Sequence, residues 1–180
     1  MTRARLFKVV SIVTLALVSC GKGESTDQKS AGSGAGDQYI ARSKATEAVE
    51  LVKKMALGAR AYYQEEQFGG DLSGAVAAHQ FPLPSAGPVP ALGACCQQGG
   101  QCQPSAAQWA DPPWVALMFS VDDPHYYSYQ YRVADDGKSI TASAYGDLDC
   151  DGSYSTFELT VTASGDDATI GPLHQTDQLE

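Results

Sequence analysis

Residues 126–163 read YYSYQYRVADDGKSITASAYGDLDCDGSYSTFELTVTA, and this stretch decides the fold. Apolar and polar side chains alternate over 126–133, 139–145 and 156–163, a period of two that is typical of half-buried strands. Asp135-Asp136-Gly137 is a turn signal between the first two of these segments. Because consecutive strands joined by short turns pair antiparallel, the stretch predicts a β-meander.

The first of these strands carries an aromatic stripe. Tyr127, Tyr129, Tyr131 and Val133 fall on one face, and Ser128, Gln130 and Arg132 fall on the other. Such a stripe can stack sugars or bases, but packing against a covering helix is the commoner role. The apolar run WVALMFSV at 114–121 precedes it, and we expect this run to form a fourth strand.

Upstream, apolar or small residues recur at spacings of three and four between Ile40 and Tyr63. This pattern predicts one long helix that is capped by Asp37 and stopped by Gly69-Gly70 just after Phe68. The predicted fold class is therefore α+β: one long N-terminal helix packed on a four-stranded antiparallel meander sheet.

Residues 69–113 are rich in proline, which excludes long helices and central strands there. Cys95, Cys96 and Cys102 lie in this connection, and Cys150 lies in the last hairpin. An even number of thiols in an exported chain predicts two disulfides that staple the Pro-rich loop.

Two pairings remain open, since a bond between the adjacent Cys95 and Cys96 needs a strained ring. Either Cys95 pairs with Cys102 and Cys96 with Cys150, or Cys96 pairs with Cys102 and Cys95 with Cys150. The competing interpretation is a metal site of four thiolates, although the spacing differs from the usual paired Cys-x-x-Cys elbows.

The first residues have the pattern of a targeting sequence. Residues 1–19 join a basic start to an apolar segment too short to span a bilayer comfortably, which predicts a secretory signal. Leu17-Val18-Ser19-Cys20 resembles the bacterial lipobox, so we expect Cys20 to be lipidated and to anchor the protein in a membrane. Gly21 favours the outer membrane, and 20–37 is expected to be a flexible tether.

The charge of the chain excludes one class of partner. The formal net charge is −9, and three of the 12 Lys and Arg residues lie within the first ten positions. Nucleic-acid binding is therefore disfavoured, because that affinity comes mainly from basic side chains that displace counterions. We place the domain at 38–165 and expect a disordered tail at 166–180.

The loop between the strands predicted at 139–145 and 156–163 is acidic. It satisfies D-x-D-x-D-G-x5-E, the spacing by which a calcium loop gathers oxygen ligands, and its candidate ligands are Asp147, Asp149, Asp151 and Glu158. The flanks alternate like strands, so an EF-hand helix pair is not expected. The alternative is a hairpin turn in which Asp side chains bind nearby amides.

These elements resemble a known family. YIARSKATEAVEL from Tyr39 and GARAYYQEE from Gly58 are similar to the soluble half of the long first helix of type IV pilins and pseudopilins. WVALMF, YSYQY and AYGDLDCDG, in that order, resemble the sheet domain of myxobacterial pilin-like proteins. The resemblance covers 38–163 and implies the head fold, a disulfide-stapled loop and a calcium-supported hairpin. The apolar polymerisation helix of pilins is replaced here by the lipobox and tether.

These features favour a non-enzymatic, lipid-anchored envelope protein with a structural or binding role, associated with a type IV pilus or type II secretion apparatus. A calcium-dependent adhesin or sensor is the first alternative. An envelope hydrolase is the second, but no nucleophile-elbow pattern is found and the three histidines are scattered, at His79, His125 and His174.

Overall fold

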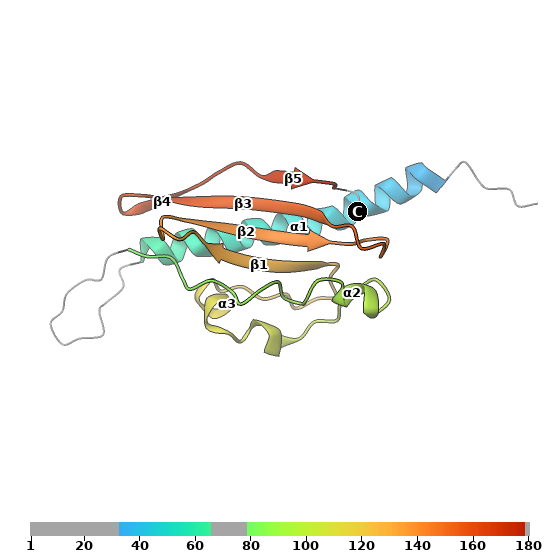
Figure 1. Cartoon of the computed structure of the whole chain (residues 1–180), viewed down its shortest axis with the longest axis horizontal. Coiled ribbons are helices and arrows are strands. Elements are labelled where there is room, and N and C mark those ends of the chain that lie inside the picture. The colour runs from blue at the N-terminus through green and yellow to red at the C-terminus, as the bar shows by residue number, and fades with distance from the viewer. Residues whose placement is uncertain (1–32, 66–78, 179–180) are drawn as a thin grey trace, which may run out of the picture. The chain divides into compact units, whose positions relative to one another are not determined.

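The computed structural model describes residues 33–65 and 79–178. The predicted signal at 1–19, Cys20 and the predicted helix end near Phe68 lie outside these residues. Within them the fold class is α+β, with one long helix against an antiparallel sheet (Figure 1). Two disulfides are present.

The long helix α1 spans Ser33–Gln64. It begins before the predicted cap at Asp37, so the last part of the expected tether is helical. Its contacts extend over β1 to β4. The side chains that face the sheet are small or slender, and five of them are fully buried: Ala48, Val52, Met55, Ala56 and Ala59. Small side chains on this face allow the helix axis to lie close to the strands.

The sheet follows the predicted antiparallel meander. It consists of β1 (Tyr127–Val133), β2 (Ser139–Gly146), β3 (Ser155–Ser164) and β4 (Asp167–Ile170) in that order, and β5 (His174–Thr176) also pairs with β3. In register, Tyr129 lies opposite Ala144, and Ala144 lies opposite Phe157. These three residues are buried under α1, which confirms that the aromatic stripe packs into the core.

The prediction of a strand at 114–121 is wrong. Residues 112–116 form the short helix α3 (Pro112–Ala116), which has Pro at its first positions. Proline there is pre-organised for a helical start, and a short apolar run alone does not distinguish a strand from a buried helix. Trp114 and Leu117 enter the core, whereas Val115 and Met118 are exposed.

The prediction of a disordered tail at 166–180 is also wrong for most of its length, because β4 and β5 lie within it. Gly165 makes the turn that starts β4, with a φ of 64° that favours glycine. Ala168 is fully buried, and the Tyr63 hydroxyl donates a hydrogen bond of 3.1 Å to the Gly165 carbonyl. Short strands with so few apolar side chains give little signal in a sequence.

The Pro-rich connection lies along the free edge of β1 (Figure 1). The Val89 and Tyr129 backbones exchange two hydrogen bonds of 2.8 Å, and the Ser85 amide donates one of 2.9 Å to the Tyr131 carbonyl. Its described part includes the short helical segments α2 (Ala94–Gln97) and η1 (Ala106–Trp109). It therefore covers a strand edge that would otherwise expose unpaired backbone groups.

Candidate functional site

The acidic loop, residues 147–154, joins β2 to β3, and its carboxylates accept hydrogen bonds from the loop's own amides. Asp147 accepts the Asp151 amide at 3.0 Å and the Gly152 amide at 3.1 Å. Asp151 accepts the Ser153 amide at 2.7 Å, and this bond lowers the pKa of the Asp151 carboxyl. This arrangement is the amide-bonded turn named above as the alternative to a calcium loop.

The structure brings together three of the four predicted calcium ligands. Carboxylate oxygens of Asp147, Asp149 and Asp151 lie within 4.8 Å of one another. Glu158 lies instead on β3, opposite Ser143 of β2. It accepts a hydrogen bond of 2.9 Å from the Ser143 hydroxyl and forms an ion pair of 3.0 Å with Arg132. The four-residue ligand set is thus split, and a cation at the hairpin would be held by the three aspartates.

The disulfides select one of the two open pairings. Cys95 is bonded to Cys102, and Cys96 is bonded to Cys150. The first bond closes the loop after α2, and the second ties α2 to the acidic hairpin. All four sulfurs are therefore committed to disulfides, and the site of four thiolates is wrong.

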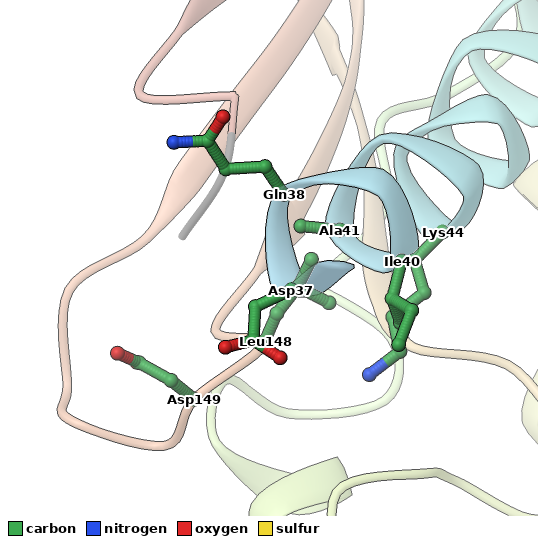
Figure 2. Close-up of a pocket in the computed structure, with 7 residues that line it drawn as sticks. All are labelled: Asp37, Gln38, Ile40, Ala41, Lys44, Leu148 and Asp149. Carbon is green, nitrogen blue, oxygen red and sulfur yellow. The ribbon is translucent and has the colours of Figure 1, made fainter. Parts of the chain in front are cut away.

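A hollow of about 440 Å³ lies between the start of α1 and the tip of the hairpin (Figure 2). It is lined by Asp37, Gln38, Ile40, Ala41, Lys44, Leu148 and Asp149. The Asp149 side chain points away from the helix in this view. The exposed side chains of Tyr39 and Ile40 flank this end of α1.

A second hollow, of about 310 Å³, lies where α1 passes the segment that leads into β1. Glu47 of α1 lines it. The Glu47 carboxylate accepts the Tyr126 amide at 3.1 and 3.2 Å and the Tyr129 hydroxyl at 2.8 Å. Burial raises the pKa of the Glu47 carboxyl, and the hydrogen bonds from Tyr129 and Tyr126 oppose that shift.

His125 lines the same hollow and is almost completely buried, with 1% of its surface exposed. Its Nδ1 lies 3.1 Å from the Asp123 carbonyl oxygen. Its Nε2 is buried and has no hydrogen-bond partner within the described part of the chain. Buried polar atoms are usually satisfied, so this nitrogen requires an explanation.

The three histidines do not meet. His79 contacts the end of α1, with its Nδ1 at 2.6 Å from the Tyr63 carbonyl oxygen, and His174 is exposed on β5. The sequence pattern missed Glu47 because its position falls outside the apolar stripe of the helix. No local pattern identifies it, because its hydrogen-bond partners Tyr126 and Tyr129 lie far away in the sequence.

No protein-family model, curated protein or solved structure matches this chain. Within the described ranges, no helix is both long and apolar enough to cross a bilayer.

Proposed function

We propose that this protein is a non-enzymatic lipoprotein of the bacterial cell envelope, held in the outer membrane by acyl chains on Cys20. Its head is of the pilin-like type and has a structural or binding role beside a type IV pilus or a type II secretion apparatus. The helix on an antiparallel meander agrees with this proposal at the level of fold class.

One observation carries the proposal. The chain has five cysteines, and the four that follow Cys20 are all used in two disulfides. An odd cysteine in an exported chain indicates an intermolecular disulfide or a reactive thiol that is open to modification. Acylation at a lipobox supplies that modification, and an anchored chain needs no polymerisation helix to stay at a membrane.

The start of α1 supports the same arrangement. The helix extends past the ends of β2 and β3 at its N-terminal end (Figure 1). Tyr39 is 76% exposed and Ile40 is 53% exposed in this region. An extended helical stem would carry the head away from an anchor at Cys20 and would leave its faces free for a partner.

The test is fractionation of cells fed with a labelled fatty acid. The intact protein should carry the label and sediment with outer membranes, whereas Cys20→Ala should carry none and remain soluble. Label that persists in Cys20→Ala would refute the anchor. The head variant Asp135→Asn, which leaves the lipobox intact, is the matched control.

A calcium-dependent adhesin or sensor is the second candidate. The observation that favours it is the convergence of Asp147, Asp149 and Asp151. Three adjacent carboxylates repel one another unless a cation or amide donors neutralise them, and calcium would bind through these oxygens.

A further inference from the structure

The two disulfides differ in how far solvent reaches them. Cys95 is 6% exposed and Cys102 is 1% exposed, so the bond between them lies in the interior. In the other bond Cys96 is half-buried and Cys150 is exposed. Thiol–disulfide exchange requires that a thiolate reach a sulfur, and exposed disulfides are the labile ones. The Cys96–Cys150 bond should therefore open first in the folded protein.

The segments that carry Cys96 and Cys150 are each held by contacts other than the bond between them. α2 is tied down by the Cys95–Cys102 bond, whose Cys102 end pairs through two backbone hydrogen bonds with the segment that leads into β1. The acidic loop is closed by the Asp147 carboxylate, which accepts two of the loop's amides. Both thiols should therefore stay within reach of each other after the bond opens.

A third ligand lies beside the two sulfurs. The Sγ atoms of Cys96 and Cys150 and a carboxylate oxygen of Asp147 lie within 4.8 Å of one another. The Asp147 carbonyl oxygen also lies 3.3 Å from Cys96 Sγ. Tetrahedral zinc holds two thiolate sulfurs about 3.8 Å apart, a separation that the opened pair can reach by side-chain rotation. These three side chains can therefore share one small cation once the bond is open.

We propose that the Cys96–Cys150 bond closes a latent metal site, and that its reduction lets both thiolates and the Asp147 carboxylate bind a soft divalent cation such as Zn²⁺. A dithiol supplies the two electrons. Its thiolate attacks Cys150 Sγ, which forms a mixed disulfide and expels Cys96 as a thiolate. The second thiol then displaces Cys150, so the reductant leaves as a cyclic disulfide. The two hydrogens of the dithiol pass to Cys96 and Cys150, and the cation displaces them as protons.

The ligand set distinguishes this site from the calcium candidate. Thiolates prefer zinc, whereas calcium takes oxygen ligands. Two thiolates and one carboxylate leave the fourth position of a zinc tetrahedron to water. The site goes beyond the binding role proposed above and does not require the lipid on Cys20. It also needs no four-thiolate arrangement, because Cys95 and Cys102 stay bonded to each other.

The first test asks which bond opens and what the opened pair binds. Full-length protein in detergent micelles is treated with limiting dithiothreitol, a dithiol, and one sample is alkylated and mapped. Cys96 and Cys150 should be alkylated while the Cys95–Cys102 bond persists.

The second sample is freed of reductant under nitrogen and titrated with CdCl₂. A saturable thiolate-to-cadmium ultraviolet band should appear at one ion per chain, ZnCl₂ should abolish it, and the oxidised protein should give none. Prior opening of the Cys95–Cys102 bond, a new Cys96–Cys102 bond, the absence of a saturable band, or an equal band in the oxidised protein would overturn the proposal.

Variants then locate the ligands. In the reduced state Cys150→Ser should lose the band, and Asp147→Asn should weaken cadmium binding about ten-fold or more. Asp135→Asn, which removes an exposed acid in the turn after β1, should leave binding unchanged. Equal weakening by Asp147→Asn and Asp135→Asn would show a general charge effect and would overturn the site. The same band in Cys20→Ala keeps this result separate from the test of the anchor, whereas loss of the band there would assign the metal to Cys20 and would overturn the proposal.

Discussion

The Tyr129 hydroxyl donates a hydrogen bond of 2.8 Å to the Glu47 carboxylate, which joins the central tyrosine of β1 to the helix that covers the sheet. Tyr129 is fully buried, and burial together with the Glu47 charge holds the pKa of its hydroxyl well above the usual range. The hydroxyl therefore remains a donor at physiological pH, and Glu47 remains its acceptor.

Loss of this acceptor should destabilise the domain. Glu47→Ala leaves the Tyr129 hydroxyl and the Tyr126 amide without their partner, and it should lower the free energy of unfolding by about 1–3 kcal/mol. Glu47→Gln keeps an amide oxygen as acceptor and should lose less. Urea denaturation at pH 7 measures both, and an equal loss in the two variants would show that the hydrogen bonds are not the cause.

The raised pKa of Glu47 has a consequence for pH dependence. In the folded state the pKa of this carboxyl lies above its ordinary value of 4.5, so the folded protein binds this proton more tightly than the unfolded chain does. The resulting stabilisation is complete below 4.5 and is lost as the pH rises through the raised folded pKa. Relative to Glu47→Gln, the native protein should therefore gain stability as the pH falls from 7 toward 4.5. A loss of stability relative to Glu47→Gln over the same pH range would contradict the raised pKa of Glu47.

The two disulfides should contribute unequally. On the loop-entropy model the Cys96–Cys150 bond, with a sequence separation of 54, contributes about 4 kcal/mol. The Cys95–Cys102 bond, with a separation of 7, contributes about 2.5 kcal/mol. Paired Cys→Ala variants, compared by thermal melting, should reproduce this order. Non-reducing peptide mapping that links Cys95 to Cys150 would refute the pairing.

Two glycines of α1 should respond oppositely to the same substitution. A Cβ at Gly58 would collide with the Leu117 carbonyl after α3, so Gly58→Ala should cost about 1–3 kcal/mol. Gly36 has open space around it, and Gly36→Ala should stabilise the helix by up to about 1 kcal/mol. Chemical denaturation of both variants is the measurement. Neutral behaviour of Gly58→Ala would argue against the close approach of these segments.

The calcium-dependent alternative predicts different effects for substitution of Asp149 and of Glu158. Calcium should raise the melting temperature of the native protein, because binding to the folded state alone stabilises it. Asp149→Asn should abolish this rise, whereas Glu158→Gln should preserve it, since Glu158 is paired with Arg132 away from the hairpin. No calcium effect in the native protein, or a rise preserved in Asp149→Asn, would exclude this candidate.

Strong periodicity made part of the fold predictable. The alternation in β1, β2 and β3 and the helical stripe of α1 each bury one face, so local pattern and tertiary packing agree. The prediction of a strand at 114–121 failed because the apolar residues there have no periodicity that distinguishes a strand from a turn of buried helix. β4 and β5 were not predicted because they contain few apolar side chains besides Ala168.

The candidate sites were also predictable only in part from the sequence. The cysteine count predicted two disulfides, but only the folded positions of Cys95 and Cys150 select the pairing. The acidic spacing predicted three converging aspartates, yet Glu158 turned toward Ser143 because the register of β2 and β3 places them opposite each other. The partly buried Glu47 could not be predicted, since its burial depends on Tyr126 and Tyr129, which are distant in the sequence.

The most direct test of the central proposal is the intact mass of the protein extracted from membranes without reduction. The account predicts a chain that begins at Cys20, carries a diacylglyceryl group and a further acyl chain, and lacks four thiol hydrogens because of its two disulfides. An unacylated chain cut at another position, or the full-length protein recovered within purified pili, would contradict it.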